Sequence, residues 1–268
     1  MADLFTVKDK VVLVSGGAKG IGKMISTGFV QAGAKVYISS RDAASCDKAA
    51  EELTKLGPGT CHSIPADLSK YDGVEGLVKE LSKREKHLNI LVNNAGNNWG
   101  APLEEYPDAA WNRVLTLNLQ RVFTLTQKLV PLLLASLPAG SPEDGPWADP
   151  ARIINIGSVD GIRVPSLETY AYSSSKAALH QLSRVLAAQL GRRGITSNTL
   201  ACGPFESKMM AATLAAARDS IVGGVPLGRI GSPSDVAGAC IFLSSKAGAY
   251  VNGATIALDG GSLVGGKL

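Results

Sequence analysis

The sequence is poor in the side chains that form metal centres and disulfide frameworks. Its 268 residues include four cysteines and three histidines. The cysteines show no short Cys-x-x-Cys spacing and the histidines lie far apart, whereas a metal site needs clustered ligands. We therefore expect no metal centre, and we interpret the thiols as reduced side chains of a cytoplasmic protein.

The sequence also lacks long apolar runs and concentrated charge. No run reaches the roughly 18 apolar residues of a membrane-spanning helix, and the first residues carry no apolar segment typical of a secretory signal. The net charge is only +4, and the Lys and Arg residues are scattered along the chain. Nucleic-acid-binding proteins concentrate their basic residues on one face. The sequence thus predicts neither a membrane nor a nucleic-acid partner.

Short β-branched segments alternate along the chain with longer segments in which apolar residues recur at helical spacing. The short segments are continuously apolar, which predicts a sheet that is buried on both faces. Repeated strand–helix units predict a parallel sheet covered by helices on both sides. We therefore expect an α/β fold, a single doubly wound Rossmann-like domain over 1–268 with a seven-stranded parallel sheet. The expected strands are 11–15, 35–40, 60–65, 90–93, 152–157, 195–200 and 254–258, and the longest expected helices are 108–137 and 169–192.

The segment 138–150 interrupts this alternation, because it is rich in Pro, Gly and acidic residues. Such a composition marks a loop. A linker between two domains is the competing interpretation. The strand pattern resumes directly after residue 150, which favours an exposed loop insertion within one domain.

A glycine-rich turn follows the first expected strand. Glycines allow a tight turn and a close approach of the backbone to a diphosphate, while the N-terminus of the next helix supplies free N–H groups. Glycine alone is a weak signal, but here a strand precedes the turn and a helix pattern follows it. We predict that this turn binds a dinucleotide through Gly16, Lys19, Gly20, Ile21 and Gly22.

A tyrosine and a lysine lie four residues apart in the expected helix 169–192. Residues at this spacing share one face of a helix, so the side chains of Tyr172 and Lys176 can reach the same place. A tyrosine with a pKa of about 10 is a poor acid or base near neutral pH, and a neighbouring cation favours its ionised form. Ser158 ends an expected strand, at the edge where doubly wound sheets bind ligands. This pattern indicates acid–base chemistry on a bound substrate.

In combination, these motifs resemble the classical short-chain dehydrogenase/reductase family over residues 11–261. The spacing Gly-x-x-x-Gly-x-Gly in the first turn and the sequence Asn-Asn-Ala-Gly at 93–96 are similar to that family. The family's Asn–Ser–Tyr–Lys tetrad has counterparts in the same order, namely Asn118, Ser158, Tyr172 and Lys176. Within the family, segments 154–162, 170–184 and 201–210 most resemble 3-oxoacyl reductases of the rhamnolipid-biosynthesis type and their fungal relatives.

The resemblance implies NADPH-dependent reduction of a ketone to a secondary alcohol, with a 3-oxoacyl thioester or another biosynthetic ketone as substrate. Tyr172 would protonate the carbonyl oxygen, and Lys176 would lower the pKa of Tyr172 and bind the nicotinamide ribose. Ser158 would orient the carbonyl, and Asn118 would hold a water molecule of a proton relay. The further cofactor contacts implied are Asp67, Leu68, Asn93, Ala95, Gly96, Gly203, Phe205 and Ser207.

The end of the second expected strand indicates the cofactor. Ser40 stands where NAD-selective members of the family carry Asp, and Arg41 can hold a phosphate with its planar guanidinium. Lys19 adds a second cation on the same side. Two unrelated surface cations are the alternative interpretation, but together with the missing carboxylate they favour NADPH/NADP+ over NAD(H). We interpret Asp42 as the N-cap of the next helix.

Three departures from the family pattern stand out. Ser15 replaces the usual Thr before the glycine turn, Cys202 stands in a position usually held by Pro, and Ser158 and Tyr172 are one residue farther apart than is common. Cys202 has no evident histidine partner, so we expect a small packing residue rather than a nucleophile.

We expect the substrate to be contacted by segments 97–101 and 160–168 and by a flexible segment, 205–226. Their apolar side chains would form a pocket suited to an acyl chain or a polycyclic ketone rather than a sugar. For Met209 and Met210 the alternative is a structural role, in which they pack a short helix against the rest of the domain. Arg163 and Lys208 could meet a phosphorylated carrier, although exposed charges are common. The predicted substrate residues are Trp99, Asp160, Ile162, Phe205, Met209 and Met210.

Two other functions remain open on the sequence alone. The same scaffold could serve alcohol oxidation, epimerisation or dehydration in natural-product biosynthesis, and a non-catalytic NADP(H)-binding regulator is a third possibility. Members of the family commonly form tetramers through the helices that correspond to 108–137 and 169–192. Both segments are apolar on more than one side here, so we expect a homotetramer.

Overall fold

The structure is a computed structural model that describes residues 2–138, 145–207 and 210–265. A parallel seven-stranded sheet forms its centre, in the order β3-β2-β1-β4-β5-β6-β7. Every expected strand is present, with ends that shift by a residue or two. The strands are β1 (Val11–Ser15), β2 (Lys35–Ser39), β3 (Thr60–Ser63), β4 (Ile90–Asn93), β5 (Ala151–Ser158), β6 (Ile195–Cys202) and β7 (Thr255–Leu258).

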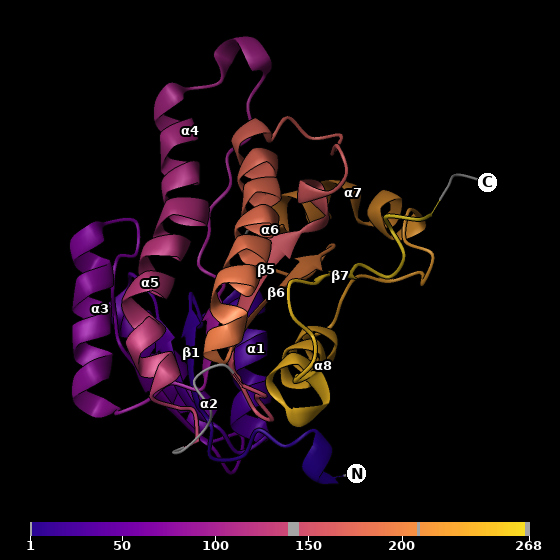
Figure 1. Cartoon of the computed structure of the whole chain (residues 1–268). Helices are drawn as coiled ribbons and strands as arrows, with labels where there is room; N and C mark the ends of the chain where they lie inside the picture. The colour runs from indigo at the N-terminus through magenta and orange to yellow at the C-terminus, as the bar shows by residue number, and fades with distance from the viewer. Residues whose placement is uncertain (1, 139–144, 208–209, 266–268) are drawn as a thin grey trace.

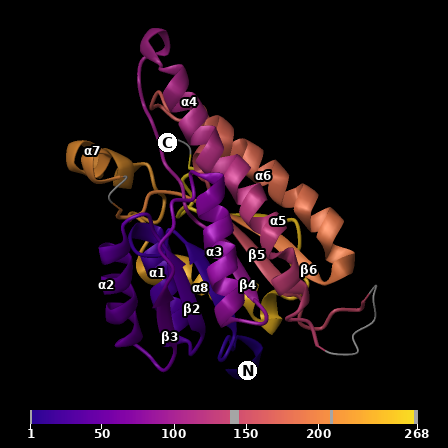
Figure 2. The ribbon, with the colours of Figure 1, turned by 90° about the vertical axis from the view of Figure 1, so that its left-hand side faces the viewer.

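Helices cover both faces of the sheet, which confirms the doubly wound, single-domain fold (Figures 1 and 2). One face carries α1 (Gly20–Gln31), α2 (Ala43–Thr54) and α8 (Pro233–Ser244), and the other carries α3 (Tyr71–Arg84), α5 (Arg121–Leu134) and α6 (Tyr170–Leu190). Two further helices, α4 (Asp108–Leu115) and α7 (Ala211–Gly223), extend past the carboxyl ends of the strands. The chain therefore forms three layers, helices–sheet–helices.

The core divides into two apolar clusters, one on each face of the sheet. Successive strand residues point to opposite faces, so Val12 and Val14 of β1 join the cluster with α1, while Val11 and Leu13 join the cluster with α3 and α5. All five residues of β1 are buried. This double burial explains why the β1 segment, Val-Val-Leu-Val, is continuously apolar.

The expected continuous helix over 108–137 is wrong in its middle. The segment begins as α4 and ends as α5, but Thr116–Gln120 between them forms a π-helical turn. Such turns insert an extra residue into a helix and often occur at functional sites. Here the wider turn carries Asn118, whose side chain is 1% exposed and bonds to groups outside the helix.

The described residues 145–150 lead directly into the amino end of β5. The Nε1–H of Trp147 donates to the carbonyl of Arg192 at 3.0 Å, and Asp149 forms ion pairs with Lys10 and Arg152. Residues 139–144 are outside the described part. Because β5 pairs with β4 in the same sheet, the strands on either side of the segment belong to one domain. That the segment is a loop insertion stays a prediction.

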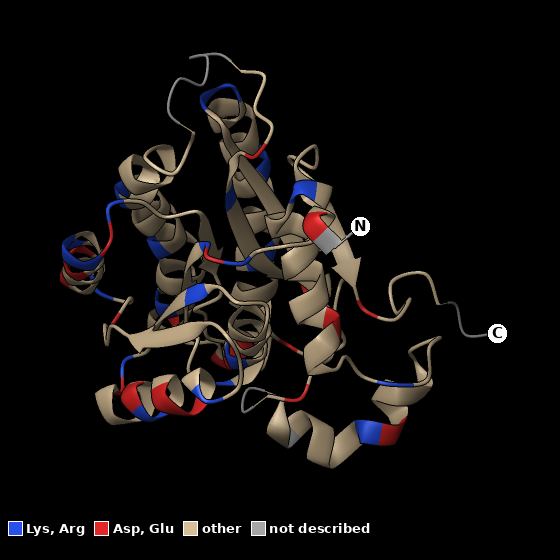
Figure 3. Cartoon of the chain, turned by 90° about the horizontal axis from the view of Figure 1, so that it is seen from below, with Lys and Arg blue, Asp and Glu red and all other residues tan. Residues whose placement is uncertain are grey.

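The surface carries charges of both signs. Lys and Arg are interspersed with Asp and Glu in the view from below (Figure 3). Within the described ranges, no helix combines the length and the apolar character needed to cross a membrane. The same residues hold no cluster of three or more His, Cys, Asp or Glu side chains suited to a metal ion.

Candidate active site

Most of the predicted site residues lie at the carboxyl edge of the sheet. The strand order reverses between β1 and β4, and ligands of doubly wound folds bind beside that point. Gly16 follows β1, Ser40 follows β2, and Ala95 follows β4. Ser158 ends β5, and Gly203 follows β6. The sheet therefore gathers segments that are far apart in the sequence.

The glycine turn has the geometry of a diphosphate cradle. Gly16 and Gly20 have φ angles of +67° and +53°, in the left-handed region that favours glycine. A Cβ atom at Gly22 would lie 2.3 Å from the carbonyl oxygen of Gly16, so the turn could not close with a larger residue. Among the described contacts, no side chain caps the first turn of α1. Its N–H groups therefore suit an anionic cofactor, and the site fits the predicted dinucleotide.

The Ser15 hydroxyl joins this turn to the segment after β4. It accepts the N–H groups of Asn94 and Ala95 at 2.9 and 3.0 Å and donates to the carbonyl of Val92 at 3.3 Å. The amide of Asn94 donates in turn to the Ser15 and Gly16 carbonyls at 2.9 and 3.2 Å. Serine in place of the family's threonine thus keeps the hydroxyl contacts that fix the turn.

Two predicted cofactor residues need correction. The side chain of Asn93 donates to Thr126 and Asn155 inside the core, at 3.1 and 2.9 Å, and does not face the cofactor side. It is Asn94, its neighbour, that reaches the glycine turn. The side chain of Leu68 is buried in the core with α3, so this residue can offer only its backbone.

Asp67 lies near the end of β2, within reach of the charge of the exposed Arg41. Burial acts to raise the pKa of Asp67, but hydrogen bonds from Ser69 and the charge of Arg41 together hold it below its usual value. Asp67 also accepts hydrogen bonds from the Ser69 N–H and hydroxyl at 3.1 and 2.7 Å. Asp42 caps α2 by accepting the Ser45 N–H at 2.9 Å, which confirms the predicted N-cap.

Tyr172 and Lys176 lie in the first two turns of α6, beside the end of β5. The Lys176 ammonium donates to the carbonyl of Ile156 at 2.8 Å and lies 5.5 Å from the centroid of the Tyr172 ring. The Ser158 hydroxyl lies close enough to the Tyr172 phenol to lower its pKa. The structure thus brings the predicted serine, tyrosine and lysine together.

The ionisation of this cluster differs from the expectation. Burial raises the pKa of Tyr172 to about 12, and it lowers the pKa of Lys176 to about 8. The Ser158 hydroxyl opposes the rise at Tyr172, whereas Asp160 adds to it. The predicted lowering of the Tyr172 pKa by Lys176 is therefore corrected, because desolvation of the phenol outweighs its neighbours. The phenol is held neutral and able to donate a proton.

Asn118 binds backbone groups rather than the other tetrad side chains. Its Oδ1 accepts the N–H of Asn97 at 2.9 Å, and its Nδ2 donates to the Asn97 carbonyl at 2.9 Å and to the Ser175 hydroxyl at 3.1 Å. Ser175 donates to the carbonyl of Tyr172 at 2.7 Å. Asn118 therefore links the segment after β4 to the first turn of α6.

The predicted substrate residues are only partly brought together. Trp99 is 39% exposed beneath the Arg113 guanidinium, and Ile162 is exposed on the segment after Ser158. The two segments meet where the Ala101 N–H donates to the carbonyl of Glu168 at 3.2 Å. Burial raises the pKa of Asp160, although Arg163, at 3.8 Å, opposes the shift.

The other predicted substrate positions lie after β6. The Phe205 ring is 2% exposed and packs in the core against Gly231, which corrects its assignment to an open pocket. Met210 immediately precedes α7, and its N–H donates to the Ser207 carbonyl at 3.0 Å. Met209 and Lys208 lie outside the described residues. Cys202 is buried in the core, and burial raises the pKa of its thiol to about 12, as expected of a packing residue.

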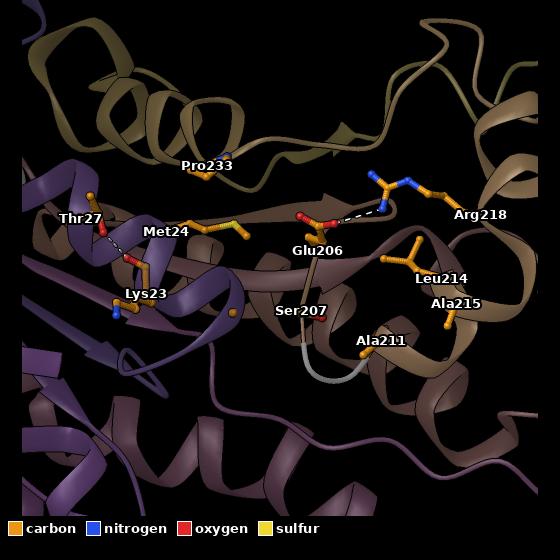
Figure 4. A pocket seen from close by; sticks show the side chains of 11 residues that line it. Lys23, Met24, Thr27, Glu206, Ser207, Ala211, Leu214, Ala215, Arg218 and Pro233 are labelled. Carbon is orange, nitrogen blue, oxygen red and sulfur yellow. Dashed lines mark hydrogen bonds and ion pairs between the residues drawn. The ribbon is translucent and has the colours of Figure 1, made fainter. Parts of the chain in front are cut away.

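A cavity of about 840 Å³ lies between α1 and α7 (Figure 4). Its described lining includes Gly20 and Ser207 of the predicted cofactor set but none of the tetrad. Met24 and Leu214 face one another across it, and Glu206 pairs with Arg218 at its edge. The hydrogen-bonded cluster, rather than the size of this cavity, marks the reaction centre.

Sequence reasoning missed residues that support the site from behind. Asn94 belongs to the Asn-Asn-Ala-Gly sequence at 93–96, of which only the other three residues were predicted to contact the cofactor. Ser175 directly precedes Lys176. His180 was considered only as a metal ligand, although it lies four residues after Lys176 on the same helix. That spacing was the available signal.

The fold and the glycine turn place the chain among Rossmann-type dinucleotide-binding proteins. Residues 16–262 match the family model described as enoyl-(acyl carrier protein) reductase. The chain belongs to the classical short-chain dehydrogenase/reductase family.

Individual relatives match along almost the whole chain. A rhamnolipids biosynthesis 3-oxoacyl-[acyl-carrier-protein] reductase of Pseudomonas aeruginosa is 44% identical, with 97% of this chain and 99% of the relative covered. A 3-oxoacyl-[acyl-carrier-protein] reductase of Thermotoga maritima is 31% identical over 96% of this chain and 99% of its own length. The solved Pseudomonas aeruginosa RhlG/NADP active-site complex superposes with a TM-score of 0.90 at 44% identity, covering 98% of this chain and 99% of the other.

Proposed function

We propose that the protein is an NADP-dependent oxidoreductase that reduces a ketone to a secondary alcohol. The observation that carries this proposal is the cluster of Ser158, Tyr172 and Lys176 at the carboxyl edge of the sheet, beside the glycine turn. The similarity to a 3-oxoacyl reductase and to an NADP complex over nearly the full chain supports the same reaction.

NADPH, when bound, supplies the hydride for the reduction. The glycine turn and the N–H groups of α1 would hold its diphosphate, and Arg41 and Lys19 would hold its 2′-phosphate. Ala95 and Gly96 would border the adenosine side, and Asp67 would contact the adenine. Gly203 and Ser207 would border the nicotinamide side.

In the proposed reaction Tyr172 donates its phenolic proton to the carbonyl oxygen of the substrate. Its raised pKa keeps the proton in place at neutral pH until the oxygen gains negative charge. The Ser158 hydroxyl lies beside the phenol and would hold the same carbonyl oxygen. Lys176 would bind the nicotinamide ribose. Asn118 would hold the segment at Asn97 against the first turns of α6, and it would also bind a water molecule of the proton relay to solvent.

For the substrate we propose a 3-oxoacyl thioester or a related biosynthetic ketone. Trp99, Ile162 and Met210 offer apolar surface near the site, which suits an acyl chain. The segment 205–226, which contains α7, would move to admit it. Likeness to fungal relatives of these reductases stays a prediction.

We also propose a cytoplasmic homotetramer. Phe123 of α5 and Val185 of α6 are 44% and 47% exposed, although both are large and apolar. Burial of such residues between copies of the chain would stabilise an assembly through these helices.

The proposal is tested by following NADPH oxidation with 3-oxoacyl thioesters, bulky apolar ketones and keto sugar acids, each in parallel with NADH. We expect turnover with NADPH and an acyl or apolar ketone. Preference for keto sugar acids would overturn the substrate proposal. Tight NADPH binding without turnover of any ketone would favour a regulator or a non-redox reaction.

A further inference from the structure

His180 lies on the same stripe of α6 as the reacting groups but has no part in the proposed proton transfer. Tyr172, Lys176 and His180 follow one another at intervals of four residues, so they line one side of the helix. The imidazole is 3% exposed and lies beside Gly157 of β5. Helix α6 packs against this strand (Figure 1). A buried polar ring in this position needs a hydrogen-bonding partner.

That partner is the backbone of Ser158. The Ser158 N–H donates to Nε2 of His180 at 3.4 Å. Ser158 is the last residue of β5, and its Oγ accepts the Asp160 N–H at 3.1 Å, where the chain turns into the short helix Val159–Gly161. The imidazole thus holds the backbone of Ser158, whose hydroxyl lies beside the Tyr172 phenol.

The turn is also shaped around the ring on both sides. A Cβ atom at Gly157 would lie 2.3 Å from Nε2, and one at Gly161 would lie 2.8 Å from Cε1 of the same imidazole. At Gly161 such an atom would also lie 2.8 Å from the backbone of Lys176 and Ala177, so this glycine allows the turn to approach α6 itself. At Gly157 the imidazole is the nearest neighbour, and the ring therefore fills the space beside the residue that precedes Ser158.

We propose that His180 is a positioning residue, which fixes Ser158 for the reaction by accepting its N–H at Nε2. This proposal rests on the proposed reductase function, because that function assigns Ser158 the role of holding the substrate carbonyl oxygen. The helix that supplies the proton donor would thereby also set the position of the group that holds the substrate oxygen. The hydrogen bond would oppose any movement of α6 relative to the end of β5, and so would keep the distance between Tyr172 and Ser158 constant.

The surroundings of His180 keep Nε2 able to accept. Burial, with the nearby charges of Lys176 and Arg184 on α6, lowers the pKa of His180 to about 4. Asp160 and Arg163 lie on the turn that follows Ser158, and Cys202 of β6 pairs with Ser158. The ring is therefore neutral at neutral pH, and the bond to Ser158 requires the tautomer with its proton on Nδ1.

Two substitutions of similar length separate the hydrogen bond from the packing. In His180→Gln, the amide oxygen can reach the position of Nε2, whereas His180→Met fills similar space with a poor acceptor. We expect kcat of the Met variant to fall about tenfold, because a buried N–H loses its partner, and kcat of the Gln variant to stay within about threefold of the wild type. The Kd for NADPH should not change in either variant. Equal kcat values for the two variants would overturn the proposal.

A double variant tests whether His180 acts through Ser158. When Ser158→Ala is already present, adding His180→Met should lower kcat no further, since coupled residues are not additive. A further tenfold loss would contradict the proposal.

A measurement without substrate separates this proposal from the proposed function. In the wild-type protein, nitrogen NMR should show His180 protonated at Nδ1 and bare at Nε2, and exchange of the Ser158 amide proton should quicken at least about tenfold in the Met variant but not in the Gln variant. A protonated Nε2, or unchanged exchange in the Met variant, would overturn the positioning role even if the enzyme is active. If the wild type reduces no ketone, the proposed function fails, and these spectra still decide whether His180 holds Ser158.

Discussion

The side-chain amide of Asn118 holds both backbone groups of Asn97, accepting its N–H and donating to its carbonyl, each at 2.9 Å. The amide thus makes the paired N–H and C=O hydrogen bonds that a neighbouring strand makes in a β-sheet. The π-helical turn makes it possible, because it directs the amide toward the segment after β4. Through this pair, the helical segment fixes the chain that leads to Trp99.

Asn118→Ala is expected to destabilise the protein by about 2–4 kcal/mol, because it removes three hydrogen bonds at a buried position. It should also loosen the Trp99 segment and lower activity. Denaturant unfolding measures the first effect, and amide exchange at Asn97 measures the second. Asn112→Ala is the control, since this exposed residue bonds only to Asp108 among the described partners and should cost less than about 0.5 kcal/mol. Similar losses in both variants would contradict the structural role of Asn118.

The fold was predictable because periodicity reports burial directly. Strands β1, β2, β4, β5 and β6 are buried along almost their whole length, whereas the edge strands β3 and β7 are partly exposed. Helices on both faces followed from the alternation of strand and helix segments. The π-helical turn was not predictable, because apolar spacing continues through residues 116–120 and the cause of the break is a tertiary contact of Asn118. Local pattern cannot report a hydrogen bond to a segment some twenty residues away.

Arg41→Ala should weaken NADPH binding by about tenfold to a hundredfold, the effect of losing a charged hydrogen bond to the 2′-phosphate. Binding of NADH should stay within about twofold, since it carries no such phosphate. Fluorescence titration of each cofactor gives both values. Lys48→Ala on α2 removes another exposed cation nearby and serves as the control. An equal loss of affinity for NADH would show that Arg41 does not bind the 2′-phosphate.

Asp160→Asn should lower the pKa of Tyr172, because the Asp160 charge helps to raise it. A phenol that loses its proton more readily is unavailable as a donor at high pH. The alkaline fall in kcat/KM, followed from about pH 8 to about pH 11, should therefore begin at a lower pH than in the wild type. Asp72→Asn, on the first turn of α3, should leave the profile unchanged. A shift to higher pH would contradict the assigned electrostatics.

Acid should destabilise the fold partly through His180. The folded-state pKa is about 4, below the ordinary value of 6.5, so the unfolded chain binds more protons between these limits. The contribution is present above about pH 6.5 and is lost as the pH falls toward 4, at a cost of about 2–3 kcal/mol. His180→Gln should flatten the fall of Tm over that window. An unchanged slope in the His180 variant would show that this residue does not titrate as described.

The candidate site was predictable in its reacting groups but not in its supports. Tyr172 and Lys176 could be identified from their four-residue spacing in a helix, and Ser158 from its position at the end of a strand. The ionisation was mispredicted because burial of the phenol depends on the packed structure, and Phe205 was misplaced because its apolar character suits a core as well as a pocket. Asn93 and Asn94 are equivalent in sequence, and only their opposite directions from β4 distinguish them.

The central claim is that Tyr172 donates the proton in an NADPH-dependent reduction, and a matched pair of variants tests it most directly. Tyr172→Phe removes the phenol at the site, and Tyr170→Phe removes an exposed phenol two residues away that bonds to Glu168. With NADPH and a 3-oxoacyl thioester or bulky ketone, kcat should fall about a hundredfold to ten-thousandfold in the first variant and stay near the wild-type value in the second. NADPH should bind both variants. Undiminished turnover by Tyr172→Phe would contradict the assignment of the proton donor.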